Sequence, residues 1–192
     1  MELDKQYFPI EGLVVLQPRV FKDDRGQFIE TYNEATLESL GFNHKFVQDN
    51  QSISQKGTFR GIHMQAAPYA QGKLVRVVKG KAMDYAIDLR PNSPTFGWSA
   101  SVLLDAEKAN QFYIPEGFGH AFLALEDDTI FAYKCTNVYN KESEIGLKWD
   151  DEEIGLLNCN YIKELRDQIA VSEKDANAMS LEEYSRNYCS SL

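Results

Sequence analysis

Long apolar runs, cysteine pairs and an excess of positive charge are all lacking in this chain of 192 residues. No hydrophobic run approaches the roughly 20 residues that a membrane-spanning helix needs, and the N-terminus lacks the basic-then-apolar order of a signal peptide. The three cysteines (Cys135, Cys159 and Cys189) are far apart and form no Cys-x-x-Cys pair, so we expect free thiols, a cytoplasmic location and no membrane association. The net charge of −9 argues against nucleic acid as a partner, because phosphates require basic surface.

The positive charge that is present is unevenly distributed. Between Gln51 and Met83 there is no acidic residue, although this segment carries six basic ones. A positive segment in an acidic protein indicates a focused anion-binding site. A solvated surface of strands and turns with chance clustering explains it equally well, and charge alone does not decide between the two. The six are Lys56, Arg60, Lys73, Arg76, Lys79 and Lys81.

Short runs rich in Val, Ile, Phe and Tyr recur between turn sequences and predict strands. Many short strands without alternating long helices indicate an all-β fold, a double-stranded β-helix or jelly-roll barrel of the cupin type. The predicted strands are Leu13–Gln17, Gln27–Tyr32, Lys45–Asp49, Thr58–Gln65, Leu74–Lys79, Met83–Leu89, Trp98–Leu104, Gln111–Ile114, Ala121–Glu126 and Thr129–Thr136.

Helices are expected to be few and mainly C-terminal. A short one is predicted over Glu34–Leu40, begun by Asn33 and ended by Gly41. In the tail, Asn160–Ala170 has helical periodicity, and Ser180-Leu181-Glu182-Glu183 is typical of a capping box that opens a last helix toward Tyr188. Because no linker rich in Gly, Ser or Pro separates this tail, we expect residues 1–192 to form one domain. Its β core spans about 1–150, and the helical extension 151–192 packs on it.

Jelly rolls of the cupin type often bind a metal through a His-x-His pair, a following Glu and a later His after Pro-x-Gly-x-x-His. The last element is present as Pro115–His120, but the first reads His63-Met64-Gln65. Two histidines fall short of the three or more ligands of a stable Zn or Fe site. We therefore expect no metal, which leaves His63 and His120 free for acid–base chemistry.

Strand periodicity places two further polar side chains on apolar faces. Lys73 is in phase with Val75 and Val77, which puts an amine either at the mouth of a pocket or at a strand end where it extends into water. Tyr133 is in phase with Phe131 and Cys135, so its ring is expected to point inward, where its hydroxyl needs a partner.

Taken together, the motifs of the chain resemble those of the dTDP-4-dehydrorhamnose 3,5-epimerases. They occur in order and with nearly constant spacing from about residue 10 to 155. They are Asp24-Arg25-Gly26, Gln48-Asp49-Asn50-Gln51-Ser52, Arg60-Gly61-Ile62-His63, Gln71-Gly72-Lys73-Leu74-Val75, Asp88-Leu89-Arg90, Ser93-Pro94-Thr95-Phe96-Gly97, Pro115–Phe122 and Tyr133-Lys134.

The resemblance implies epimerisation of a nucleotide-diphosphate 4-keto-6-deoxy sugar at C3 and C5, with dTDP-4-dehydro-6-deoxy-D-glucose as substrate and dTDP-4-dehydro-L-rhamnose as product. Such an enzyme removes a proton beside the ketone, stabilises the enolate and returns a proton on the opposite face. The resemblance assigns His63 as the base, Tyr133 as the acid and Lys73 as the cation at the enolate. It implies no cofactor, because no electrons are transferred.

The resemblance also implies the remaining site residues and a homodimer. Asp175, in Ser172-Glu173-Lys174-Asp175, is expected to orient His63, and Arg25 and Glu30 are expected to reach across the dimer into the neighbouring site. The segment 156–170 is longer than the family pattern, so the sequence leaves open whether Asp175 and Lys174 stay at the site. The other expected substrate-binding residues are Gln48, Asn50, Arg60, His120, Tyr139, Glu144 and Lys174.

Strict alternation would point Arg60 and His63 to opposite faces of one strand, so we predict a bulge or kink at Gly61. Two alternative functions stay open. One is a related enzyme that epimerises a single carbon or moves the keto group. The other is a carbohydrate-binding cupin without catalytic activity.

Overall fold

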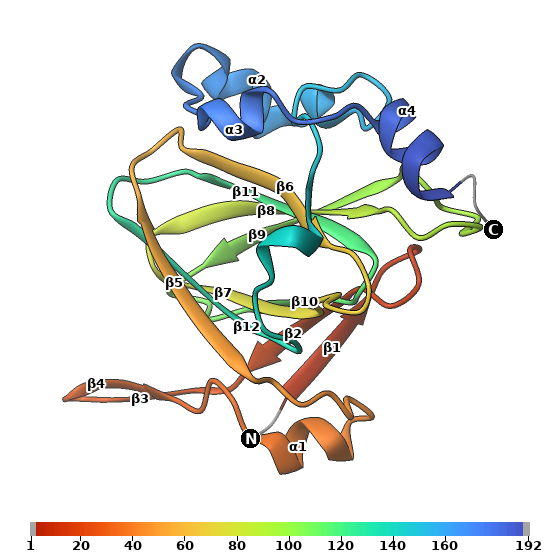
Figure 1. Ribbon diagram of the computed structural model, residues 1–192. Helices are drawn as coiled ribbons and strands as arrows, with labels where there is room; N and C mark the ends of the chain where they lie inside the picture. Colours follow the sequence, from red (N-terminus) through yellow and green to blue (C-terminus); the bar gives the residue numbers. More distant parts are fainter. Residues whose placement is uncertain (1–2, 190–192) are drawn as a thin grey trace.

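Two antiparallel sheets face each other in the computed structural model, which describes residues 3–189 (Figure 1). The six-stranded sheet has the order β1 (Leu3–Tyr7), β2 (Val14–Pro18), β10 (Gln111–Ile114), β7 (Lys73–Lys79), β12 (Thr129–Cys135) and β5 (Gln48–Ser54). The five-stranded sheet has the order β13 (Glu144–Gly146), β6 (Phe59–Gln65), β11 (Phe118–Ala124), β8 (Lys81–Asp88) and β9 (Ser99–Asp105).

The core between the sheets is built from the apolar side chains of alternating strand positions. Val75 and Val77 of β7 and Phe131 of β12 pack there with Phe122 of β11. The rings of Phe122 and Phe131 stack across the two sheets with centroids 4.0 Å apart. The predicted all-β jelly-roll barrel is confirmed, since sheets with one apolar face are stable when those faces pack together.

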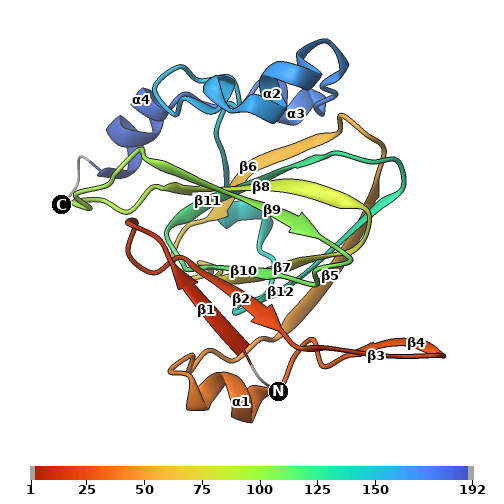
Figure 2. The ribbon, with the colours of Figure 1, turned by 180° about the vertical axis from the view of Figure 1, so that it is seen from behind.

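An arm of chain extends from the barrel on the side of the six-stranded sheet (Figure 2). It consists of the hairpin β3 (Val20–Asp23) and β4 (Gly26–Ile29), which is followed by α1 (Glu34–Ser39). The Asn33 side chain accepts a hydrogen bond from the Thr36 amide, so the predicted N-cap of α1 is confirmed.

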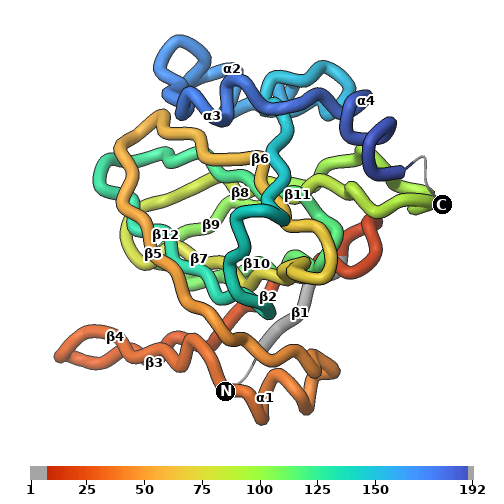
Figure 3. Tube along the Cα trace, viewed as in Figure 1, coloured from red at the N-terminus to blue at the C-terminus, as the bar shows by residue number. Residues whose placement is uncertain are grey.

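The C-terminal segment covers the outer face of the five-stranded sheet, as the tube in Figure 3 shows. Two short parallel bridges fasten it, from Ala170 to Thr58 and from Met179 to Leu147. The predicted capping box at Ser180 is confirmed. The helical elements here are α2 (Asn160–Leu165), α3 (Glu173–Ala176), α4 (Leu181–Tyr184) and the single turns Leu156–Asn158, Arg166–Gln168 and Ser185–Cys189. A further single turn, Lys141–Ser143, comes directly before β13.

The structure corrects several predicted boundaries. The strand predicted at 45–49 starts at Gln48 and runs to Ser54, because this edge strand pairs with β12 through polar residues that carry no apolar alternation signal. The sequence missed β1, β3 and the three-residue β13. The helix predicted over 160–170 ends at Leu165, and Ala170 bonds to the β core instead. Among the helices of the described residues, none has the length and apolar character to cross a membrane.

Candidate active site

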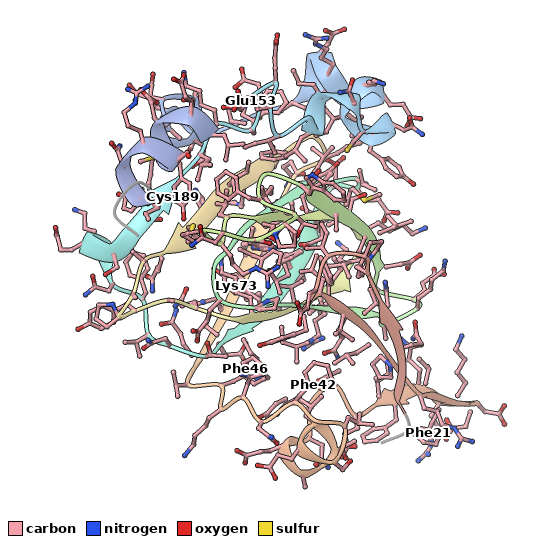
Figure 4. All side chains as sticks on the ribbon, turned by 90° about the vertical axis from the view of Figure 1, so that its right-hand side faces the viewer. Phe21, Phe42, Phe46, Lys73, Glu153 and Cys189 are labelled. Atoms are coloured by element: carbon pink, nitrogen blue, oxygen red, sulfur yellow. The ribbon has the colours of Figure 1, made fainter. Side chains whose placement is uncertain are left out.

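A cavity of about 530 Å³ opens between the two sheets under the C-terminal segment. Figure 4 shows the labelled Lys73 in the interior of the molecule, between the sheets. Most of the sequence-predicted site residues lie in the wall of this cavity. The lining residues are Gln51, Ser52, Thr58, Phe59, Arg60, His63, Met64, Gln65, Gln71, Lys73, His120, Phe122, Tyr133, Tyr139, Glu144, Ala170, Val171, Ser172, Lys174 and Asp175.

His63 is held at this cavity by a carboxylate from the C-terminal segment. Its Nε2 atom lies 2.6 Å from Oδ1 of Asp175, whose side chain is almost fully buried. Burial by itself would raise the pKa of Asp175, but the hydrogen bond from His63, together with the Gly61 amide and the Ser172 side chain, holds it below its usual value. Asp175 is therefore a carboxylate near neutral pH, so it accepts a hydrogen bond from the Nε2–H group of His63, which leaves Nδ1 with the lone pair.

The position of Asp175 follows from a helix start. Ser172 is the N-cap of α3, and its hydroxyl accepts a hydrogen bond from the Asp175 amide. The bridge from Ala170 to Thr58 brings this turn beside β6. With this arrangement of the segment 156–170, both Asp175 and Lys174 line the cavity.

The predicted irregularity at Gly61 is confirmed. His63 pairs with His120 and Arg60 pairs with Phe122, so two residues of β6 stand opposite a single residue of β11. Gly61 has φ +119°, and a Cβ atom there would lie 2.5 Å from the His120 carbonyl oxygen. This bulge turns Arg60 and His63 into the same cavity, which regular alternation would have prevented.

Lys73 and Tyr133 come from adjacent strands of the opposite sheet. Lys73 is only 8% exposed, and its Nζ atom donates to the His63 carbonyl oxygen at 3.3 Å. Burial lowers the pKa of Lys73, while Cys135, Asp84 and Glu144 oppose that shift. Burial also raises the pKa of Tyr133, so its phenol keeps its proton at neutral pH and can act as an acid.

A second imidazole–carboxylate pair lies deeper in the cavity. His120 Nε2 is 2.8 Å from Oδ2 of Asp84, and both side chains are buried. Burial, with Lys73 and His63 nearby, lowers the pKa of His120 well below its usual value, so this imidazole is neutral. The sequence analysis did not predict the partnership of Asp84. Its signal is an acid in the middle of the strand β8, in phase with the core residues Ala82 and Ala86.

The outer rim of the cavity carries a three-residue polar cluster. Oε2 of Glu144 accepts a hydrogen bond from the Tyr139 hydroxyl at 3.0 Å and lies 2.6 Å from Nζ of Lys174. Burial works to raise the pKa of Glu144, but Lys174 and Tyr139 hold it below its usual value. This rim combines a half-exposed aromatic ring with charge, as ligand-binding surfaces often do.

The other predicted substrate-binding residues fall into three groups. Arg60 lines the cavity, and its Nε atom donates to Ser54 Oγ at 3.1 Å. Gln48 and Asn50 stand behind the wall: Gln48 accepts from the Tyr139 amide, and Asn50 donates to the Cys135 sulfur. Arg25 and Glu30, the remaining pair, are part of the hairpin arm and of its junction with α1, and they are absent from the cavity wall of their own chain.

The acid-free segment divides in the same way. Arg60 and Lys73 line the cavity, which supports an anion-binding role for them. Lys79 and Lys81 form salt bridges on the surface with Asp128 and Asp105. The segment is therefore partly a binding surface and partly an ordinary solvated strand end.

The model of the dTDP-4-dehydrorhamnose 3,5-epimerase family matches residues 7–183. Curated epimerases of that name from Methanothermobacter thermautotrophicus (45% identity, covering 91% of this chain and 92% of the relative) and Escherichia coli (49%, 77% and 80%) are similar. The crystal structure of a dTDP-6-deoxy-D-glucose-3,5-epimerase from Legionella pneumophila, in complex with dTDP-4-keto-L-rhamnose, superposes with a TM-score of 0.88 at 40% identity, covering 94% of each chain.

Proposed function

Because the chain belongs to the dTDP-4-dehydrorhamnose 3,5-epimerase family and is an isomerase of that class, we propose that the cavity binds a dTDP-linked 4-keto-6-deoxy sugar and inverts it at C3 and C5. The observation that carries this proposal is the placement of a carboxylate-oriented imidazole and a protonated phenol on opposite walls of one cavity.

His63 is the proposed base. With Nε2–H donated to Asp175, the Nδ1 lone pair takes the proton from a carbon next to the C4 ketone. The imidazolium that forms is stabilised by the Asp175 carboxylate at 2.6 Å. Asp175 therefore orients the base, and its negative charge balances the positive charge that His63 gains when it takes the proton.

The electron pair left by that proton moves onto the ketone oxygen as an enolate. The Lys73 ammonium is the proposed stabilising charge, and its buried surroundings strengthen its field. Tyr133 then donates its hydroxyl proton to the same carbon from the other face, which inverts the centre. His63 then releases its proton to solvent and Tyr133 takes one up, after which the second carbon, on the other side of the ketone, is inverted by the same sequence of steps.

The nucleotide is proposed to lie at the outer rim. Arg60 and Lys174 offer positive charge to the diphosphate, and Tyr139 and Glu144 face the nucleoside. His120, kept neutral and oriented by Asp84, would contact the sugar as a hydrogen-bonding partner.

Incubation with the dTDP-4-keto-6-deoxy sugar in heavy water tests this function. Deuterium is expected at both C3 and C5. His63→Ala is expected to abolish the exchange and to retain dTDP binding, whereas His44→Ala, which alters the one histidine outside the cavity, is expected to exchange as the wild type does. Deuterium at one carbon would support a single-carbon enzyme, and tight binding without exchange would support a non-catalytic cupin.

A homodimer completes the proposal. The hairpin arm presents Phe28 at 69% exposure and Phe21 at 48%, with the Arg25 side chain at its tip, and a second copy could cover these groups and receive Arg25 and Glu30 at its cavity. Light scattering is expected to give twice the chain mass, and Arg25→Ala is expected to raise the KM. A monomer at working concentration would contradict this assignment.

We further propose that residues 1–192 fold as one domain in the cytoplasm. The packing of the C-terminal segment on the β core supports the first point, and three free cysteines, suited to a reducing compartment, support the second. If the chain is one domain, unfolding by urea or heat is expected to show one cooperative transition.

A further inference from the structure

The segment 137–140, which carries Tyr139, has neither helix nor strand structure. Among the described residues, no backbone-to-backbone hydrogen bond involves residues 137–139. The ring of Tyr139, which faces the proposed nucleotide site, is thus carried by a segment that no helix or strand hydrogen bonds fix in place. Its backbone groups must be satisfied in another way, because partly buried polar groups need partners.

Three glutamine side chains supply those partners. Gln71 Nε2 donates to the Asn137 carbonyl oxygen at 2.8 Å, and Gln48 Oε1 accepts from the Tyr139 amide at 2.7 Å. Gln65 makes two contacts to the same segment: Nε2 donates to the Val138 carbonyl oxygen at 3.2 Å, and Oε1 accepts from the Asn140 amide at 2.8 Å. We call Gln48, Gln65 and Gln71 the glutamine clamp.

Gln65 is the central member of this clamp. It is only 4% exposed, and its second Nε2 hydrogen is donated to the Tyr69 carbonyl oxygen at 2.6 Å. Both amide hydrogens are therefore used by the protein, and none is left to donate to a ligand. Gln65 is thus equipped to hold the chain rather than to bind the substrate.

The strand that carries Gln65 also carries the proposed base. Gln65 follows His63 by two residues in β6, so the two side chains share one face. The same strand pairs with β13, where Glu144 stands opposite Gln65 and bonds the Tyr139 hydroxyl. One strand therefore sets both the place of the reacting sugar and the place of the aromatic ring at the other end of the ligand.

We propose that Gln65 is a positioning residue, which fixes Tyr139 relative to His63 and thereby sets the affinity for the nucleotide. This inference rests on the proposed function, in which Tyr139 faces the nucleoside. Its chemical basis is that an ordered binding loop pays less conformational entropy when the ligand binds. The position is also where metal-binding cupins place their second histidine, and here an amide serves the loop instead.

A double-mutant cycle with Gln65→Leu and Tyr139→Ala tests the inference. Gln65→Leu is expected to raise the KM, and the Kd of dTDP alone, about tenfold, with kcat within about twofold of wild type. In the Tyr139→Ala background the same change is expected to have almost no further effect, because Gln65 acts through Tyr139. Gln65→Glu, which keeps the acceptor for the Asn140 amide and loses both donors, should give an intermediate Kd.

Asn110→Leu is the matched control. Asn110 is also a buried amide that holds a turn, since it donates to the Leu103 carbonyl oxygen and accepts from the Asp105 amide, but it lies outside the cavity wall. It is expected to lower the Tm and to leave the Kd of dTDP unchanged.

An unchanged Kd in Gln65→Leu would overturn the inference, and so would an equal rise in the Tyr139→Ala background or in Asn110→Leu. If Tyr139→Ala by itself leaves the Kd unchanged, both the role of Tyr139 and the inference fall, while deuterium exchange at C3 and C5 still reports separately on the proposed reaction.

Discussion

The hydrogen bond between His63 and Asp175 offers the sharpest test of the proposed chemistry. Asp175→Asn replaces the carboxylate that accepts from Nε2 at 2.6 Å by a neutral amide of the same shape. A hydrogen bond to a charged group contributes about 1.5–3 kcal/mol, which corresponds to about 10–150-fold in rate if it acts in the transition state.

The amide has a second effect, on the tautomer of His63. If its NH₂ group faces Nε2, the imidazole proton moves to Nδ1, and the lone pair that faces the substrate is lost. Both effects act in the same direction. We therefore expect exchange of substrate hydrogen in heavy water to slow by about 100-fold or more, with the Kd of dTDP unchanged within about twofold.

The assay is the initial rate of deuterium incorporation, followed by mass spectrometry, at saturating substrate. Glu173→Gln is the matched control, since it removes one acidic charge from the same helix at an exposed position. A variant Asp175→Asn that exchanges at more than half the wild-type rate would refute the role of Asp175, and a control that slows as much would assign the effect to charge or folding.

Two further predictions concern the acid and the fold. Tyr133→Phe should still allow His63 to exchange hydrogen at the substrate, but it should lower the rate of inversion by about 100-fold because the proton donor on the opposite face is gone. NMR of the product measures the inversion. An inversion rate equal to that of the wild type would contradict this role of Tyr133. Asp88, buried, is held at a pKa of about 2: burial opposes ionisation, but hydrogen bonds from Arg90, Ser93 and Thr95 favour it more. Because the folded pKa lies below 3.8, the usual value for an aspartate in an unfolded chain, the carboxylate contributes stability above pH 3.8 and loses it as the pH falls toward 2. Asp88→Asn should therefore lower the free energy of unfolding by about 2 kcal/mol at pH 6. Urea titrations should show the difference in unfolding free energy between wild type and variant decreasing toward pH 2. A difference that does not depend on pH would contradict the reasoning.

Much of the fold was accessible from local patterns. Apolar runs such as Thr129–Thr136 and turn chemistry such as Asp24-Arg25-Gly26 depend on neighbours in the chain, and they predicted ten strands close to where most of them lie. Caps such as Asn33 and Ser180 are local too, and both were predicted. Strands with a weak pattern were misplaced or missed: the bounds of β5 were wrong because it is polar along most of its length, and β13 was missed because it has only three residues.

The candidate site divides along the same line. The motifs named His63, Lys73 and Tyr133, and the family resemblance that these motifs carry implied proton transfer beside a ketone. The resemblance also named Asp175 as the partner of His63, but only the tertiary structure showed how this residue, 112 positions away, reaches the imidazole. Only the tertiary structure paired His120 with Asp84 and assigned Gln65 to a loop. The physical reason is range: a strand or a cap is decided by neighbours along the chain, whereas a hydrogen bond between distant residues depends on how both sheets and the C-terminal segment pack at once.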